Sequence, residues 1–154
     1  MNLSDFLLPN AVRVLGQSAG KKRLFQDLSE IAHQAFGISA ADAFDALMER
    51  ESLGPTGVGH GIALPHARLH GLDRIAAVFV RLERPMDYDS VDRQPVDLVL
   101  ALFTPKNSGV EHLKALAQVS RTMREATTCA KLRANSDPAA LHAVLTEART
   151  IQAA

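Results

Sequence analysis

Hydrophobic residues in the first third of the chain recur at the spacing of amphipathic helices. Residues 21–36 carry an apolar stripe at intervals of three and four residues, which predicts a helix with one buried face. The stripe consists of Leu24, Leu28, Ile31, Ala32 and Ala35. Ser39 and Asp42 then form the Ser-x-x-Asp pattern of a helix N-terminus, so we expect a second helix from there to about Glu51. Nearer the N-terminus, residues 3–8 predict a short helical turn.

The hydrophobic period changes in the middle of the chain. Residues 75–82 are apolar and β-branched and lie between Gly71 and Pro85, a pattern that predicts a strand. Residues 96–104 are almost continuously apolar, which is typical of a central strand covered on both faces. Between these two segments, the stretch PMDYDSVDRQP predicts a short edge strand with turns.

The last third of the chain returns to helical spacing. Ser108 and Glu111 repeat the capping pattern, and the apolar positions behind them predict a helix to about Arg124. Residues 127–133 predict a short helix that carries the cysteine. The Asp-Pro pair at 137–138 then marks the start of a final helix, because proline is favoured at the first helical position.

The order of helices, then strands, then helices indicates an α/β fold. We expect a single compact domain of residues 1–154 with a mixed central β-sheet flanked by helices. The length is near the commonest domain size, and 47% of the residues are hydrophobic, enough to bury a core without disulfides or structural metal. The single cysteine, Cys129, excludes an intramolecular disulfide and fits a reducing compartment.

Charge and targeting patterns narrow the range of partners. The 17 basic and 17 acidic residues balance, so the chain has no broad positive field for nucleic acid or an anionic membrane. The N-terminal MNLSDFLLPN lacks the basic start and long apolar run of a secretory signal, and no apolar run approaches the length of a membrane span. We therefore expect a cytoplasmic protein that binds no nucleic acid and does not insert into a membrane.

The segment GPTGVGHGIALPHARLH, residues 54–70, has four glycines within eight residues. A Walker loop requires lysine and then serine or threonine after its last glycine, but Ile62 follows Gly61. A dinucleotide-binding loop requires a strand before its glycines and a helix after them, and the predicted order here is the reverse. The glycines therefore do not predict a nucleotide cofactor.

A metal site built from histidines is the next candidate. His60, His66 and His70 offer three nitrogens, but Pro65 and Gly71 argue against the helix on which a His-x-x-x-His pair binds zinc. The sequence has no His-Glu-x-x-His pattern, and no cysteine lies nearby. We predict neither a metal nor another cofactor.

A tight turn with histidines scattered on the surface is the simplest alternative. It suits His70, in a polar turn, and His33 and His142, on predicted helices, all of which we expect to be solvated or packed. It suits His66 less well, because Pro65 fixes the backbone before it and glycines allow other segments to approach closely. We expect a rigidly held imidazole at the end of a strand.

Two further residues favour a reactive His66. His112 falls in the first turn of a predicted helix, where free N–H groups and the positive dipole end bind phosphate. Arg50 ends the helix before the glycines, where its guanidinium can bind the same oxygens. A neutral imidazole is a competent nucleophile, so phosphoryl transfer through a phosphohistidine suits this set without a metal. Two alternatives stay open: Arg50 as an ordinary surface arginine, and His112 as a buried, hydrogen-bonded side chain.

Three stretches, GPTGVGHGIALPHA, ERPMDYDSVDRQPVDLVLALFTP and EHLKALAQVSR, resemble the IIA domains of the bacterial phosphotransferase system. The likeness is to the fructose/mannitol superfamily, and specifically to its stand-alone nitrogen-regulatory IIA proteins, over roughly residues 3–147. It implies a compact α/β fold with a mixed central sheet. It also implies phosphorylation on His66, a phosphoryl-holding role for His112, and a site arginine at Arg50.

The resemblance also implies partners. A histidine-phosphorylated carrier protein is expected to donate the phosphoryl group, and the nitrogen-regulatory members act on targets such as potassium transporters or sensor kinases according to phosphorylation state. The alternative is a sugar-specific IIA component that passes the phosphoryl group to the cysteine of a IIB domain for sugar uptake. A third interpretation is a binding module whose histidines no longer react.

Three residues depart from the pattern of many nitrogen-regulatory members. His60 replaces asparagine, Pro55 replaces serine and Ala67 replaces glycine. His60 introduces a candidate second titrating group near His66. Pro55 is expected to stiffen the loop, and Ala67 excludes backbone angles that only glycine adopts.

Overall fold

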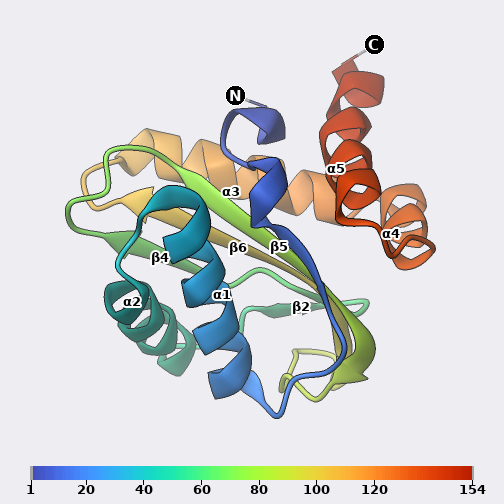
Figure 1. The fold of residues 1–154 in the computed structure, drawn as a ribbon, viewed down its shortest axis with the longest axis horizontal. Helices are drawn as coiled ribbons and strands as arrows, with labels where there is room; N and C mark the ends of the chain where they lie inside the picture. Colours follow the sequence, from blue (N-terminus) through green and yellow to red (C-terminus); the bar gives the residue numbers. More distant parts are fainter. Residues whose placement is uncertain (1, 154) are drawn as a thin grey trace.

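The computed structural model describes the backbone of residues 2–153 and the side chains of residues 2–147. Within these residues, five α-helices, six strands and two short 3-10 helices form an α/β structure (Figure 1). The helices are α1 (Lys21–Phe36), α2 (Ala40–Ser52), α3 (Gly109–Met123), α4 (Ala126–Arg133) and α5 (Pro138–Ala153). The strands are β1 (Val12–Leu15), β2 (Gly57–Gly59), β3 (Ile62–Ala63), β4 (His66–Leu69), β5 (Ala76–Met86) and β6 (Val96–Pro105). The 3-10 helices are Leu3–Asp5 and Pro9–Ala11.

The sheet is mixed, with strand order β1-β5-β6-β3-β2 and with β4 also paired to β6. β5 and β6 are antiparallel, whereas β1 runs parallel to β5 and both β3 and β4 run parallel to β6. Side chains of β6 alternate between two buried clusters: Leu98 and Leu100 belong to one, and Val99 and Ala101 to the other. The prediction of a central strand covered on both faces is confirmed.

Helices cover both faces of this sheet (Figure 1). Leu24 and Leu47 of α1 and α2 pack in one cluster, and Val119, Leu132 and Leu141 of α3, α4 and α5 pack in the other. The predicted apolar stripes of α1, α2 and α5 are the buried faces of these helices. The stripe predicted for α3 from Val110 and Leu113 is wrong, because these two side chains are 65% and 64% exposed and α3 buries the face that carries Val119. The α/β fold with a mixed sheet flanked by helices is confirmed.

The two predicted capping patterns have different outcomes. Ser39 caps α2 through its side-chain oxygen, which accepts a hydrogen bond from the Asp42 N–H at 3.2 Å. Ser108 does not cap α3, because its backbone is already helical and its hydroxyl donates back to the Pro105 carbonyl at 2.7 Å. The helix still begins where expected, at Gly109.

The strand predictions need two corrections. β5 continues past Pro85 to Met86. Its pairing with β6 is irregular between Arg81 and Met86, so the missing N–H of the proline removes no regular ladder hydrogen bond. The edge strand predicted in the segment before β6 is wrong: beyond Met86 the chain forms turns and irregular structure. Asp89 and Arg93 in this segment have φ values of 61° and 60°, which an extended strand cannot contain.

Three strands were not expected: β1, β2 and β4. Each has four residues or fewer, too short to display a period of two above the surrounding pattern. The helical turn expected over residues 3–8 is a 3-10 helix at Leu3–Asp5, and a second one follows at Pro9–Ala11.

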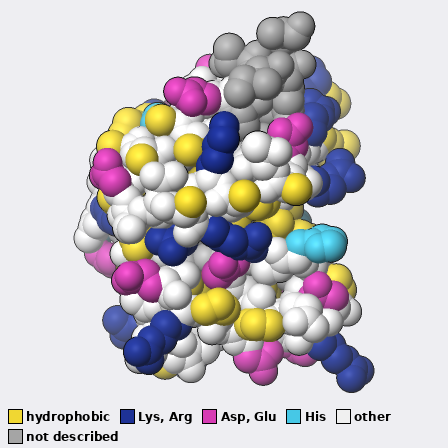
Figure 2. Space-filling model, turned by 90° about the vertical axis from the view of Figure 1, so that its right-hand side faces the viewer, with side chains coloured by type: hydrophobic (Ala, Val, Ile, Leu, Met, Phe, Trp, Pro, Cys, Tyr) yellow, Lys and Arg dark blue, Asp and Glu magenta, His cyan; other side chains and the backbone are white. Residues whose placement is uncertain are grey.

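Charged groups of both signs are interspersed on the face in Figure 2. This distribution agrees with the balanced composition of the sequence. Among the described residues, none of the helices combines the length and apolar character that crossing a bilayer requires.

Candidate functional site

His66 lies at the first position of β4, so it begins a strand rather than ending one as expected. The carbonyl of Pro65 accepts a hydrogen bond from the Leu102 N–H at 2.9 Å, and His66 is paired with Leu102 in the parallel ladder. The side chain is half-buried. Proline and ladder together fix the backbone beneath the imidazole.

Both ring nitrogens of His66 have a hydrogen-bonding partner. Nδ1 lies 3.0 Å from the carbonyl oxygen of Leu64, and Nε2 lies 3.3 Å from Nε of Arg50. A carbonyl oxygen only accepts, so Nδ1 carries the ring proton. An arginine N–H only donates, so Nε2 presents its lone pair. This tautomer makes Nε2 the nucleophilic nitrogen.

The surroundings of His66 keep its ring neutral. Burial lowers the pKa of His66 from its usual value near 6.5, and the charge of Arg50 lowers it further. The hydrogen bond to Leu64 and the carboxylate of Glu51 act in the opposite direction without cancelling the shift. At neutral pH the lone pair on Nε2 is therefore available.

His112, in the first turn of α3, faces His66. The two ring centroids are 6.0 Å apart and the ring planes are inclined by 54°. His112 is 6% exposed, and its Nδ1 lies 2.6 Å from Oγ1 of Thr104. Burial lowers the pKa of His112, and the charges of Arg68 and His66 lower it further. His112 is thus a buried, hydrogen-bonded side chain, as the alternative held, and it is also adjacent to His66.

Arg50 lies in the last turn of α2 and connects two parts of the site. Its Nε donates to His66, and its Nη1 donates to the carbonyl of Gly54 at 3.1 Å. Arg50 is thus half-buried and hydrogen-bonded to His66, and its functional role stays a prediction. The predicted site residues His66, His112 and Arg50 come together from a strand, a helix start and a helix end.

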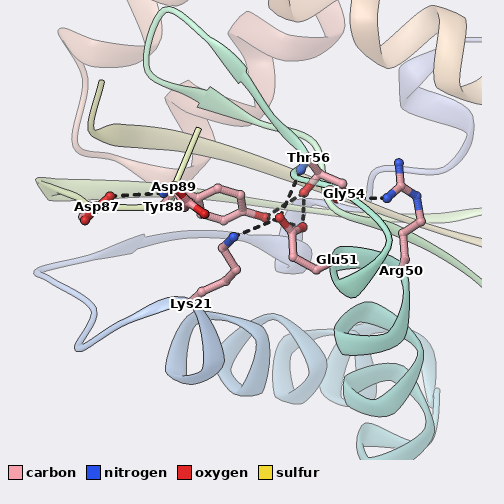
Figure 3. Close-up of polar contacts among 8 residues, drawn as sticks. All are labelled: Lys21, Arg50, Glu51, Gly54, Thr56, Asp87, Tyr88 and Asp89. Atoms are coloured by element: carbon pink, nitrogen blue, oxygen red, sulfur yellow. Dashed lines mark hydrogen bonds and ion pairs between the residues drawn. The ribbon is translucent and has the colours of Figure 1, made fainter. Parts of the chain in front are cut away.

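Glu51, the next residue along α2, is the centre of a buried polar network (Figure 3). One carboxylate oxygen accepts from Lys21 Nζ and from the Thr56 N–H, both at 3.0 Å. The other accepts from the hydroxyls of Thr56 and Tyr88. Burial raises the pKa of Tyr88 far above its usual value, so its phenol stays protonated and donates. Figure 3 shows Glu51 turned toward this network and Arg50 turned away from it, toward Gly54.

The glycines allow other segments to pass close to residues 54–61. A Cβ atom at Gly57 would lie 2.5 Å from Oγ of Ser90. One at Gly61, where φ is 80°, would lie 2.6 Å from Nη2 of Arg133. The close approach expected from the glycines is confirmed, and here the approaching groups are protein atoms.

Sequence reasoning missed two side chains of the site, Arg68 and Thr104. Arg68 is two residues after His66 on the same face of β4, and its register partner on β6 is Thr104. Thr104 binds His112, and the charge of Arg68 acts on the same ring. Strand alternation over residues 66–69 is the signal that would have placed Arg68 beside His66.

His60 is remote from His66. It lies in the turn between β2 and β3, where its N–H donates to Asp92 at 3.0 Å and its carbonyl accepts from Arg133 at 2.7 Å. The carbonyl of the next residue, Gly61, accepts a hydrogen bond from the Leu98 N–H of β6. The partner of His66 on β6 is Leu102, four residues further along the strand, which corresponds to a separation of roughly 13 Å. The titrating neighbour of His66 is therefore His112.

The remaining histidines are packed or solvated, as expected. His33 binds the Ile38 carbonyl at 3.0 Å, His142 binds the Leu7 carbonyl at 2.9 Å, and His70 is exposed. The described side chains contain no group of three His, Cys, Asp or Glu residues placed to hold a metal ion. Ala67 is in regular strand conformation, so its position does not require glycine.

Comparison with known protein families identifies this arrangement. Residues 5–148 match the family described as "Phosphoenolpyruvate-dependent sugar phosphotransferase system, EIIA 2". The chain belongs to this family. The resemblance read from the glycine and histidine motifs is thus confirmed.

The relatives of this IIA chain include nitrogen regulatory proteins. The one from Bradyrhizobium diazoefficiens is 41% identical over 145 residues, which cover 94% of this chain and 95% of that protein. The one from Escherichia coli is 35% identical over 148 residues, covering 96% and 91%.

Solved structures give the same result for the fold. The nitrogen regulatory protein IIA-Ntr of Neisseria meningitidis is similar with a TM-score of 0.84 and 32% identity, covering 94% of this chain and 99% of that one. The mannitol IIA of Escherichia coli has the same fold, with a TM-score of 0.71 at 17% identity over 89% of this chain and 96% of that one.

Proposed function

We propose that this IIA protein accepts a phosphoryl group on Nε2 of His66 from a histidine-phosphorylated carrier protein. The observation that carries the proposal is the environment of this nitrogen: its lone pair lies 3.3 Å from Arg50 Nε, in a ring 6.0 Å from that of His112. Membership of a phosphotransferase family supports the same chemistry. The acting unit is the single domain of residues 1–154, in the cytoplasm.

In the transfer step, the lone pair of His66 Nε2 forms a bond to phosphorus. The bond between phosphorus and the donor's ring nitrogen breaks, and its electron pair returns to the donor imidazole. His66 keeps its Nδ1 proton, so its ring becomes positively charged. The Leu64 carbonyl, 3.0 Å from Nδ1, stabilises that charge.

Arg50 and His112 hold the phosphoryl oxygens. The transition state is loose, so the protein acts mainly by alignment and by shielding charge. When Nε2 is occupied, the Nε–H of Arg50 turns from that nitrogen to a phosphoryl oxygen. Thr104 holds Nδ1 of His112, which leaves its Nε2–H to donate to a second oxygen.

The output of phosphorylation is regulatory. Relatives of 31–41% identity over most of their length are nitrogen regulatory proteins, which supports this function for the chain. The targets are proteins such as potassium transporters or sensor kinases, bound according to the phosphorylation state of His66.

The test is phosphorylation of the whole chain by purified phosphorelay donors, followed by mass spectrometry. The parent protein and the His70→Ala control, altered at an exposed turn, should each gain one phosphoryl group, and His66→Ala should gain none. Uptake by His66→Ala equal to that of the parent would refute the assignment. A pull-down with both forms then tests the output, since equal capture of all partners would exclude a switch.

Sugar uptake is the second candidate function. It is favoured by the fructose-specific EIIABC component of Bacillus subtilis, 30% identical over 141 residues that cover 22% of that protein. In this case phosphorylated His66 should pass its phosphoryl group rapidly to the cysteine of a IIB domain. Transfer assays with purified IIB domains separate the two functions, and a chain that takes up no phosphate would be a binding module instead.

A further inference from the structure

A groove of about 710 Å³ lies between the β2–β3 turn and the junction of α3 and α4. This volume is within the usual range of small-molecule sites. Aliphatic side chains line it, among them Val58, Leu64 and Ala130, and the imidazole ring of His60 lies at its edge. On the side of the molecule in Figure 2, hydrophobic, basic, acidic and histidine side chains lie close to one another across the middle of the face.

The charged groups that line the groove are all basic. They are the guanidinium groups of Arg124 and Arg133, and no Asp or Glu side chain contributes to the lining. Arg133 is held by a bidentate pair with Asp97, which fixes its position. Arg124 is exposed and makes no ion pair with a described side chain, so its guanidinium is available to a ligand.

We propose that this groove binds a small amphipathic carboxylate. Its aliphatic chain lies on Val58, Leu64 and Ala130, and its carboxylate lies at Arg124. The charge complementarity favours an anion, because Arg124 lines the groove without a carboxylate partner among the described side chains, whereas Arg133 is already paired with Asp97. A planar guanidinium binds a carboxylate through two parallel hydrogen bonds.

Leu64 connects this groove to His66. Its side chain lines the groove, and its carbonyl oxygen accepts the hydrogen bond from Nδ1 of His66 at 3.0 Å. A ligand that moves Leu64 therefore changes the orientation of the imidazole. The effect on phosphorylation rests on the proposed function of His66, whereas the binding itself does not.

Isothermal titration calorimetry with decanoate, below its micelle concentration, tests the binding on the whole unphosphorylated chain. Arg124→Gln should weaken decanoate binding about ten-fold, because it removes a charge-assisted bond. The matched control Arg121→Gln, altered at an exposed arginine of α3 outside the groove, should bind like the parent. Ala130→Trp fills the groove from an exposed helix position and should abolish binding. Decyltrimethylammonium, with the same chain and a positive head group, should not bind.

NMR of the histidine rings tests the link to His66. Saturating decanoate should shift the ring resonances of His66 in the parent and leave them unchanged in Ala130→Trp. Equal decanoate binding by Ala130→Trp, or equal binding of the cation, would overturn the site. So would sedimentation that shows a dimer for the parent and a monomer for Ala130→Trp, since the groove would then join two copies of this chain. Binding without a shift at His66 would refute the link alone.

Discussion

The two ends of the glycine segment are held by different kinds of polar contact. At residues 54–57, the carboxylate of Glu51 binds Thr56 and Lys21 with only 7% of its side chain exposed. At residues 59–61, Arg133 binds Asp97 and the carbonyl of His60. Here the side chains of Arg133 and Asp97 are 37% and 19% exposed. Both ends therefore have an ion pair and a backbone contact, and they differ in burial.

Burial decides how much each end resists rearrangement. Removal of a buried carboxylate leaves several buried polar groups without partners. When a more exposed ion pair is broken, water binds the separated groups, so the cost in free energy is small. The strongly fixed end lies next to Arg50 and His66. The weakly fixed end lies next to the groove. Rigidity is thus concentrated next to His66, the nucleophile of the proposed function.

The largest effect is expected from Glu51→Ala, which removes the centre of the buried end. Tyr88 and Thr56, both buried, would lose their shared acceptor, so unfolding free energy should fall by about 3 kcal/mol in urea denaturation. Phosphorylation of His66 should slow as well, because Arg50 is the neighbouring residue. Glu49→Ala, on the exposed side of the same helix, is the control and should change stability little. Equal losses in the two variants would show that the network does not fix this end.

Gly57→Ala tests the close packing at the same end. The added Cβ would lie 2.9 Å from the Ser90 backbone and closer still to its side chain, so stability should fall by about 2 kcal/mol. Gly54→Ala is the matched control, since no atom lies within 4 Å of its Cβ position. Removing the Ser90 side chain with Ser90→Gly should recover part of the loss in a double-mutant cycle. Additive effects would contradict the contact.

The elements predicted from the sequence are the long ones. Helix 21–36 and the apolar run that forms β6 extend over enough residues for their period to be read. β4 has only four residues, and it forms because it pairs in parallel with β6. This pairing depends on the tertiary fold and cannot be read from the local sequence. The missed strand also hid Arg68, since only strand alternation places it beside His66.

The site residues that could be predicted are those that belong to a local sequence motif. His66 follows a proline, His112 falls in a first helical turn, and Arg50 ends a helix, and each of these positions can be read from the neighbouring residues. The contacts of Glu51 with Tyr88 and of His112 with Thr104 depend on packing between distant segments. The error about His60 has the same origin, because sequence proximity to His66 did not reveal the separation along β6.

Arg133→Gln should have a smaller effect than either change at the buried end. Its pair with Asp97 is partly exposed, so the expected loss of unfolding free energy is about 0.5–1 kcal/mol. Salt screens exposed ion pairs, and in 1 M sodium chloride the Debye length is only about 3 Å. The difference in unfolding free energy between Arg133→Gln and the parent should therefore shrink at this salt concentration. Arg121→Gln, at an exposed position, is the control for removal of a charge. A loss as large as that of Glu51→Ala would mean that both ends are equally fixed.

The smallest effect is the pH dependence of stability that His66 and His112 contribute. Both have a pKa lowered by burial, so the unfolded chain binds protons at these rings more readily than the folded protein does. Their contribution is fully present above pH 6.5, the value of an exposed histidine, and is lost as pH falls through the lower folded values. Urea denaturation between pH 7 and 5 should therefore show a shallower decline for a His66→Gln, His112→Gln double variant than for the parent. His70→Gln, at an exposed site, should keep the parental slope. An unchanged slope in the double variant would mean that the two rings protonate as easily in the folded protein as in the unfolded chain, and the neutral nucleophile would lose its physical basis.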